Sequence, residues 1–207
     1  MVEYHKIVTA WERDPATNHK RLLEGVWAEP EFGFLKDNEW VWTEKVDGTN
    51  IRVMWDGSSV RFGGKTDAAQ LYVPLIERLQ VLFYSGALAR IFDGPACLYG
   101  EGYGAKIQKG GGNYIADAVD FCLFDVLVGD TWLERRNVEG IGNKLECKIA
   151  PVVGRGSLLD AIEKTRMGFD SIWGPFKAEG MVVRPAVELK TRRGRRIITK
   201  IKRKDFF

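Results

Sequence analysis

Alternating apolar and polar residues in the first part of the chain predict short β-strands separated by turns. Residues 39–45 (EWVWTEK) and 50–55 (NIRVMW) are rich in aromatic and β-branched side chains, which favour strands. Asp47-Gly48 and Asp56-Gly57 are turn signals, and a third strand is expected at residues 60–62. This order predicts a meander of three antiparallel strands.

The spacing of apolar residues then becomes helical. Large apolar side chains recur at this spacing across residues 68–91, which predicts one long amphipathic helix. Ser157 precedes a second such segment and is expected to cap a helix there. Further strands are expected at residues 97–101, 121–128, 180–184 and 197–202. Because strands outnumber helices and follow one another as hairpins, the predicted fold class is α+β with antiparallel sheets.

Length and composition exclude several classes of protein. The chain has 207 residues, of which 45% are apolar, enough for one large domain or two small ones. No apolar run approaches the roughly 20 residues of a membrane span, and the charged N-terminus is unlike a signal peptide. We therefore expect a cytoplasmic or intracellular protein without a membrane partner.

The numbers and positions of cysteine and histidine argue against several kinds of metal and catalytic site. Cys97, Cys122 and Cys147 are widely spaced and form no CxxC pair, so ordinary reduced thiols are expected. His5 and His19 are the only histidines, which argues against a catalytic triad or a histidine-rich metal site. Acid–base and metal chemistry would then depend on carboxylates and lysines.

Basic residues are concentrated near the C-terminus. The net charge is only +3, but residues 190–204 are rich in Lys and Arg and contain no acid. Such a run is typical of a nucleic-acid surface or of a plain solvated surface. Isoleucines at positions 197, 198 and 201 interrupt it, which favours a basic strand over a flexible tail.

Lys45 is the first candidate for chemistry, because it ends an apolar strand where a turn begins. Partial desolvation and nearby cations at such a position favour the neutral, nucleophilic amine. A surface lysine at a hairpin is the alternative, since the pattern KxDG is short.

Four further segments place charged residues at strands. Glu101 and Glu179 are each followed by glycine, at the end and at the start of a predicted strand. Phe124 precedes an acid within an apolar strand. Lys200 and Lys202 lie on one face of a strand, because strand side chains repeat every two residues.

In this order, the segments resemble motifs I, III, IIIa, IV and V of the covalent nucleotidyltransferase superfamily, which comprises ATP-dependent DNA ligases, RNA ligases and mRNA capping enzymes. The resemblance covers residues 40–206. It implies one nucleotidyltransferase domain over residues 1–207, with the active site between two antiparallel sheets and no C-terminal OB-fold or helical domain.

The closest branch is the second-type phage RNA ligases and their editing-ligase relatives. Asn50 stands where DNA ligases usually carry Arg, and the ending from Lys200 to Phe206 is also similar to that branch. Asp47 departs from it, because several of those ligases have His there. The resemblance thus implies an ATP-dependent RNA ligase, and the branch suggests that a virus or phage could encode it. The alternatives are a DNA ligase, a capping guanylyltransferase and a non-catalytic nucleic-acid-binding module of the same fold.

The resemblance also implies individual roles. Lys45 would attack ATP and carry AMP, Lys200 and Lys202 would bind the α-phosphate, and Glu179 would bind Mg²⁺ or Mn²⁺. Glu101 would accept a hydrogen bond from the ribose. Phe124 would stack on adenine, with core packing as the alternative. The remaining nucleotide or end-phosphate contacts would come from Glu44, Asp47, Asn50 and Lys65.

The expected partner is nucleic acid with 3′-hydroxyl and 5′-phosphate ends, as in nicked RNA or an RNA/DNA duplex. The basic residues 190–204, or a protein partner in place of a second domain, would grip it. Lys106 and Lys109, beside a glycine run, would form either a nucleic-acid loop or a solvated one.

Overall fold

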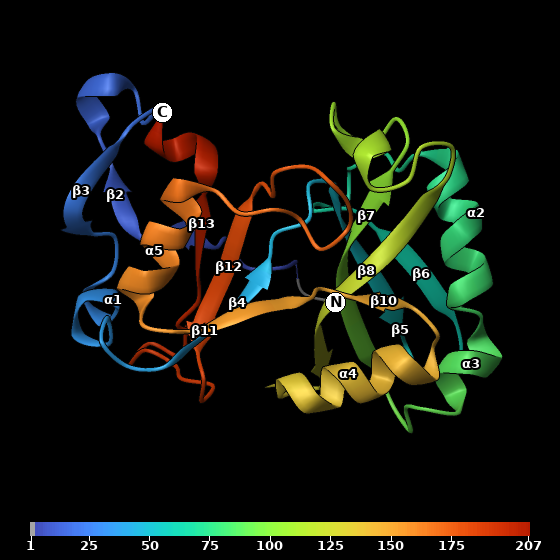
Figure 1. Cartoon of the computed structure of the whole chain (residues 1–207). Helices are drawn as coiled ribbons and strands as arrows, with labels where there is room; N and C mark the ends of the chain where they lie inside the picture. Colours follow the sequence, from blue (N-terminus) through green and yellow to red (C-terminus); the bar gives the residue numbers. More distant parts are fainter. Residues whose placement is uncertain (1–2) are drawn as a thin grey trace. The chain divides into compact units, whose positions relative to one another are not determined.

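The computed structural model describes residues 3–207 and divides the chain into two compact units (Figure 1). Unit 1 is Val46–Ala150 together with the N-terminal residues up to His5, and unit 2 is Lys6–Lys45 and Pro151–Phe207. Each unit has its own sheet and hydrophobic cluster, and most strand pairs are antiparallel, which confirms the predicted α+β class. Within residues 3–207, no helix has the length and apolar character needed to span a membrane.

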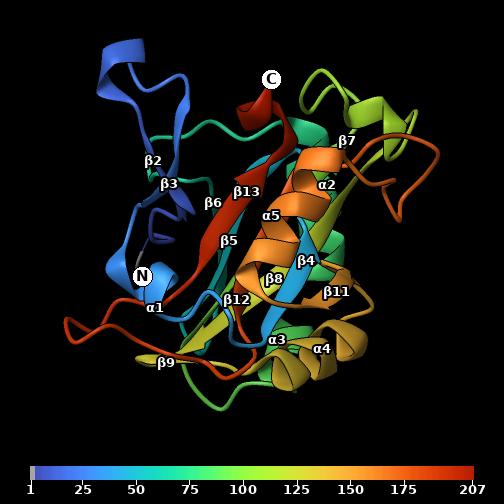
Figure 2. The same cartoon turned by 60° about the vertical axis from the view of Figure 1, so that its left-hand side comes forward.

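Unit 2 is built on a five-stranded sheet with the order β1-β13-β12-β4-β11. The strands are β1 (Val8–Thr9), β13 (Thr199–Lys202), β12 (Gly180–Pro185), β4 (Trp40–Glu44) and β11 (Val152–Gly156). Helix α5 (Leu158–Met167) packs on this sheet, as Figure 2 shows, and buries Leu158 and Ile162 against Met181 and Ile201. Ser157 caps α5 as predicted, in a reciprocal capping box with Asp160.

The remaining elements of unit 2 are short. They are the hairpin β2 (Trp11–Arg13) and β3 (Leu22–Trp27), helix α1 (Pro30–Phe34), and the 3₁₀ helices η1 (Pro15–Thr17) and η3 (Arg203–Phe206).

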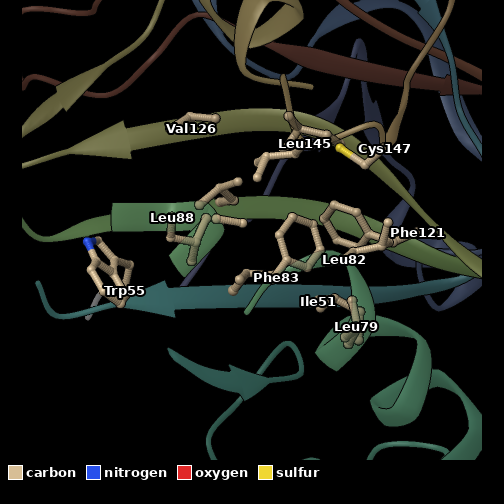
Figure 3. Packing of buried hydrophobic residues seen from close by; sticks show 14 of the residues in the cluster. Ile51, Trp55, Leu79, Leu82, Phe83, Leu88, Phe121, Val126, Leu145 and Cys147 are labelled. Carbon is tan, nitrogen blue, oxygen red and sulfur yellow. The ribbon is translucent and has the colours of Figure 1, made fainter. Parts of the chain in front are cut away.

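Unit 1 is built on a sheet with the order β10-β8-β7-β5-β6, to which β9 adds beside β8. The strands are β5 (Thr49–Trp55), β6 (Val60–Gly63), β7 (Ala96–Gly104), β8 (Val119–Val128), β9 (Thr131–Trp132) and β10 (Lys148–Ile149). The helices are α2 (Val73–Leu82), α3 (Ser85–Ala89), α4 (Arg135–Lys144) and the 3₁₀ helix η2 (Gly111–Asn113). Ile51 and Trp55 of the sheet share a buried cluster with Leu79 of α2, and Phe83 meets Phe121 edge-on at 5.0 Å (Figure 3).

A β-bulge in β8 determines which side chains of this strand face the buried cluster and which face the opposite side of the sheet. Tyr99 of β7 pairs with Asp125, but the next residue, Gly100, pairs with Leu123, so Phe124 is the extra residue. Leu123 and Val126 both belong to the buried cluster although they are three positions apart, which a regular strand would not allow. The bulge therefore keeps Phe124 only half-buried.

The predicted three-strand meander is wrong at its first connection. β4 pairs with β11 and β12 in unit 2, whereas β5 pairs with β6 and β7 in unit 1. A Cβ atom at Gly48 would stand 2.1 Å from the carbonyl oxygen of Gly102. Asp47-Gly48 thus serves a close approach to β7 after the chain has left the first sheet, and it closes no hairpin.

The single helix predicted for residues 68–91 is also wrong, because Phe83 and Tyr84 separate α2 from α3. Pro74 lies at the start of α2, where its fixed φ and missing N–H are tolerated. Tyr84 has an extended backbone before α3 begins. Both helices bury apolar residues in the same cluster, which explains why the helical spacing continues across the break.

The basic residues 190–204 form a strand only at β13. The preceding residues make a loop joined by a bridge between Lys190 and Arg196. Arg196 is buried and donates to the Glu188 carboxylate, and Arg195 donates to both oxygens of Glu29 at 2.8 Å. These two arginines therefore pair with acids of unit 2.

Candidate active site

Three strand ends in unit 2 bring two lysines to one carboxylate. Lys45 directly follows β4, Glu179 directly precedes β12, and Lys202 ends β13. The Nζ atom of Lys45 lies 2.6 Å from Oε2 of Glu179, and that of Lys202 lies 2.7 Å from Oε1. These side chains are 21%, 20% and 15% exposed for Lys45, Lys202 and Glu179, so the cluster is partly desolvated but open to a ligand.

Glycine at position 180 allows this approach. Its φ of +154° is rarely adopted by other residues, and a Cβ atom there would lie 2.0 Å from the carbonyl oxygen of Ile201. The Gly180 carbonyl also accepts the backbone N–H of Lys45 at 3.0 Å, and Gly180 pairs in register with Lys202. The Glu-Gly pair recognised in the sequence is thus what seats Glu179 beside both lysines.

The cluster carries an excess of positive charge. Burial acts to raise the pKa of Glu179, but attraction to Lys45 and hydrogen bonds from Lys202 and Lys45 outweigh it and hold that pKa below its ordinary value. Lys200 lies on the same face of β13 as Lys202, since Thr199 and Ile201 are the buried residues of that strand. Two ammonium groups on one ionised carboxylate, with Lys200 on the same face of β13, form a site suited to phosphate oxygens.

Glu44, the residue before Lys45, is buried and accepts two hydrogen bonds from the loop that precedes Glu179. Glu44 is only 2% exposed. Its Oε1 atom accepts a hydrogen bond from the Ser171 hydroxyl at 2.5 Å, and its Oε2 atom accepts one from the Ile172 backbone N–H at 2.9 Å. In this arrangement Glu44 anchors the loop that leads from α5 to Glu179. Whether it also contacts adenine stays a prediction.

Glu44 should give stability a distinctive pH dependence. Burial raises its pKa above the ordinary value of 4.5, and the two hydrogen bonds only partly offset this. The folded protein therefore binds the proton more tightly than the unfolded chain, so this contribution to stability is lost as pH rises above 4.5. Urea unfolding of Glu44→Gln between pH 4 and 7 should lack this decline, with the exposed Glu12→Gln as control. If the free energy of unfolding changed with pH in the same way in wild type and Glu44→Gln, this prediction would be wrong.

The candidate residues of unit 1 lie on the face of its sheet opposite the buried cluster. Asn50 of β5 pairs in register with Glu101 of β7. The bulge places Phe124 on this face, where its ring meets Tyr4 edge-on at 5.1 Å, and the Tyr4 hydroxyl donates to Asp125 at 2.5 Å. Asn50 also has a buried Oδ1 atom with no hydrogen-bond partner among residues 3–207.

The two other candidates of unit 1 lie in loops. The backbone N–H of Asp47 donates to the Tyr114 hydroxyl at 3.1 Å. Lys65 is exposed in the loop that follows β6. The structure thus joins Lys45, Glu179 and Lys202 directly, pairs Asn50 with Glu101, and leaves the role of each a prediction.

A divalent cation fits this chain only with help from its substrate. In the part of the chain that the structure describes, no group of three His, Cys, Asp or Glu side chains is placed to hold a metal ion. Mg²⁺ usually takes one or two protein carboxylates together with phosphate oxygens and water. Glu179, with lysines that would steady the phosphates, matches such a donor set.

Comparison with known proteins identifies the family of the chain. The sequence model of the RNA ligase family matches residues 38–202, which includes Lys45, Glu179 and Lys202. The chain belongs to the RNA ligase family. The match begins just before β4 and ends with β13, so it contains every candidate site residue.

Solved RNA ligases from Naegleria gruberi share the fold. A mutant with ATP and Mn superposes with a TM-score of 0.67 at 17% identity, over 84% of this chain and 51% of that chain. A mutant with AMP and Mn gives 0.65 at 17% identity, over 94% and 55%. An apo mutant gives 0.66 at 15% identity, over 99% and 60%. The present chain therefore spans about half the length of these RNA ligases.

Two residues near the candidate site escaped the sequence analysis. Ser171 holds Glu44, but nothing marks one serine in a loop as a partner of a distant strand. Arg52 alternates with Ile51 and Val53 and reads as an outward, solvated side chain, yet it is fully buried. The burial of Arg52 could have been inferred from the sequence. The glycine-rich loop that it binds directly follows β6, which pairs with β5, so this loop is expected to lie beside Arg52.

Proposed function

We propose that this chain is the nucleotidyltransferase part of an ATP-dependent RNA ligase, which joins 3′-hydroxyl and 5′-phosphate ends through a lysyl-AMP intermediate. The observation that carries the proposal is the cluster of Lys45, Lys202 and Glu179 at three adjacent strand ends. It combines a nucleophile with an oriented carboxylate and a second cation that suits a phosphate. A structural ion pair would need only one of the two lysines.

The first step forms the covalent intermediate. Lys45 begins as an ammonium group and loses one proton to become the nucleophilic amine. Its nitrogen attacks the α-phosphorus of ATP, the bond to the bridging oxygen of the β-phosphate breaks, and pyrophosphate leaves. A second proton is released as the P–N bond forms. Lys200 and Lys202 would hold the α-phosphate oxygens and neutralise the charge that develops there.

The second and third steps move AMP and then release it. The oxygen of a 5′-phosphate end attacks the phosphorus on Lys45, the P–N bond breaks, and the amine regains protons. A 3′-hydroxyl then attacks the phosphorus of that activated end, loses its proton, and displaces AMP as the phosphodiester forms. Each step is an in-line displacement, so positioning and charge supply most of the catalysis.

Glu179 would hold Mg²⁺ or Mn²⁺ together with phosphate oxygens, and a bound cation would neutralise phosphate charge during the displacement. In unit 1, Glu101 would accept a hydrogen bond from a ribose hydroxyl and Phe124 would stack on adenine. Asn50, Asp47 and Lys65 would contact the nucleotide or the end phosphate, and Glu44 would add an adenine contact.

The deciding experiment combines labelled nucleotides with a panel of nicked duplexes. We expect label from ATP, and not from GTP, on the protein in the presence of Mg²⁺ or Mn²⁺. We expect sealing when ribose stands at the nick. Label from GTP alone would indicate a capping enzyme, and sealing restricted to deoxyribose would indicate a DNA ligase. No label from either nucleotide would favour a non-catalytic binding module and overturn the proposal.

The proposed nucleic-acid partner can be tested at the tip of the loop before β13, where Arg192 and Arg193 are exposed. Each phosphate contact adds about 0.7 to the salt slope of binding to a single strand. Arg192→Gln with Arg193→Gln should therefore weaken RNA binding and reduce the slope of log K against log salt by roughly 1.4. The matched control changes Lys20 and Arg21 to Gln in the exposed turn of the β2–β3 hairpin. An unchanged slope of log K against log salt would show that the phosphate contacts are made by other residues.

Arg196 should behave differently from these exposed arginines. Because it is buried against Glu188, Arg196→Gln would remove the nearest cation from that carboxylate, leave it with Arg184 at 3.9 Å, and should lower stability first. A partner protein that helps to hold the substrate, and an intracellular location, complete the proposal. A viral or phage origin would be consistent with the branch that the motifs resemble.

A further inference from the structure

Arg52 is the most deeply buried charged residue near the candidate residues of unit 1. It lies in the middle of β5, and its side chain is 0% exposed. Removing a guanidinium group from water is costly unless its donors are well used, and an apolar residue of similar size would pack there more favourably. The contacts of Arg52 therefore indicate what its burial achieves.

Two hydrogen bonds join the Arg52 side chain to one loop, the segment after β6. Its Nε donates to the Gly64 carbonyl at 2.8 Å, and its Nη2 donates to the Asp67 carboxylate at 2.6 Å. These two anchors enclose Lys65 and Thr66. The loop is also held by a hydrogen bond from the Ala69 N–H to the Thr66 carbonyl at 3.2 Å.

The loop would have little order without these anchors. It starts with Gly64, directly after Gly63 at the end of β6, and glycine loses more backbone freedom on ordering than other residues. Lys65 is a long, flexible cation whose value for a phosphate depends on being held in place beforehand. Arg52, which is fixed in the sheet, thus orders a loop whose own sequence favours flexibility.

The loop also lies beside another candidate phosphate contact. A Cβ atom at Gly64 would stand 3.7 Å from the Asn50 carbonyl oxygen, so the loop backbone runs along the start of β5. Asn50 and Arg52 are two positions apart and share one face of that strand. The loop that carries Lys65 is therefore fixed to the same strand that presents Asn50.

We infer that Arg52 is a positioning residue, which holds the loop from Gly64 to Asp67 so that Lys65 binds a phosphate of the reaction. The inference rests on the proposed function and deepens it. The phosphate belongs either to ATP or to the 5′ end of the nucleic acid, and both present the same anionic oxygens to the ammonium group.

Asp67 offers a test that spares the core. Its side chain is 85% exposed, so Asp67→Asn removes one anchor of the loop at little expected cost in stability. Lys65→Ala should lower the rate of its step by about 10²-fold, as expected for a lost charge stabiliser. Asp67→Asn should lower the same step by roughly tenfold, because a misplaced group loses part of its effect.

Two assays distinguish the source of the phosphate. Self-adenylylation across ATP concentrations reports on the nucleotide, whereas sealing of a 5′-adenylylated RNA with a free 3′-hydroxyl reports on the end phosphate. The step lowered by Lys65→Ala should be the step lowered by Asp67→Asn and by Arg52→Lys. Asp130→Asn, at an exposed acid in the β8–β9 turn, is the matched control and should leave both assays unchanged.

The double variant separates positioning from a structural role. If Arg52 acts through Lys65, Asp67→Asn should cost nothing further in a Lys65→Ala background. Three results would overturn this inference while leaving the proposed function intact. They are fully additive losses in the double variant, normal rates in Lys65→Ala, and a lowered melting temperature that accounts for the loss in Asp67→Asn. Failure of the wild type to form lysyl-AMP would instead remove the proposed function, and this inference with it.

Discussion

Replacing Lys45 with alanine is expected to abolish covalent labelling of the protein by ATP. The P–N bond can form only at an unprotonated amine next to the phosphate, and Lys45 is the lysine that follows β4 and contacts Glu179 at 2.6 Å. Intact-mass measurement should show wild type with one added AMP after incubation with ATP and Mg²⁺, and no added mass on Lys45→Ala. Lys36→Ala, at a lysine of the same unit whose side chain is 39% exposed, should label like the wild type.

A second measurement separates loss of the nucleophile from loss of the fold. The last step of the proposed reaction joins an already adenylylated end and does not use the Lys45 amine as a nucleophile. Lys45→Ala should therefore still seal a 5′-adenylylated RNA, although it cannot start from ATP. Persistent labelling of Lys45→Ala would move the nucleophile to another lysine. Loss of both activities together with a lowered melting temperature would show damage to unit 2.

Local patterns were enough to locate the strands that carry the candidate residues, whereas the resemblance to family motifs brought Lys45, Glu179 and Lys202 together as one site. The aromatic and β-branched residues of β4 and β5 predict strands wherever these strands pair. The two-residue period of β13 places Lys200 and Lys202 on one face without knowledge of its partners. Ser157 and Asp160 form their capping box within four consecutive residues. Each of these features depends on near neighbours in the chain.

Features that depend on distant partners could not be predicted in the same way. The neighbours of β4 are β11 and β12, which follow it by more than a hundred residues, so the nearby turn signal at Asp47-Gly48 indicated the wrong partner. The bulge that keeps Phe124 out of the buried cluster appears only in the register with Tyr99 and Gly100. The burial of Arg52 and Arg196 was missed for a different reason, because their partners Asp67 and Glu188 lie in loops whose composition is typical of solvated segments.

Replacing Glu179 with glutamine is expected to have the second large effect, on joining and on the pH dependence of stability. The carboxylate faces Lys45 through one oxygen and Lys202 through the other. Glutamine keeps the shape but offers only one acceptor oxygen, carries no charge, and is a poor ligand for a hard cation. Labelling by ATP should fall by about 10²–10³-fold, the usual effect of removing one electrostatic stabiliser from a phosphoryl-transfer site. Glu163→Gln, at an exposed acid of α5, is the control.

Stability provides an independent measure of the same carboxylate. Because the folded protein holds the pKa of Glu179 below its ordinary value of 4.5, the ionised form favours folding. This contribution is present above pH 4.5 and is lost as pH falls through the lowered pKa of the folded state. The stability advantage of wild type over Glu179→Gln in urea unfolding should therefore shrink as the solution is acidified below pH 4.5. An advantage that stays constant with pH would show that the two lysines do not hold Glu179 ionised. A wild-type labelling rate in Glu179→Gln would remove this carboxylate from the reaction.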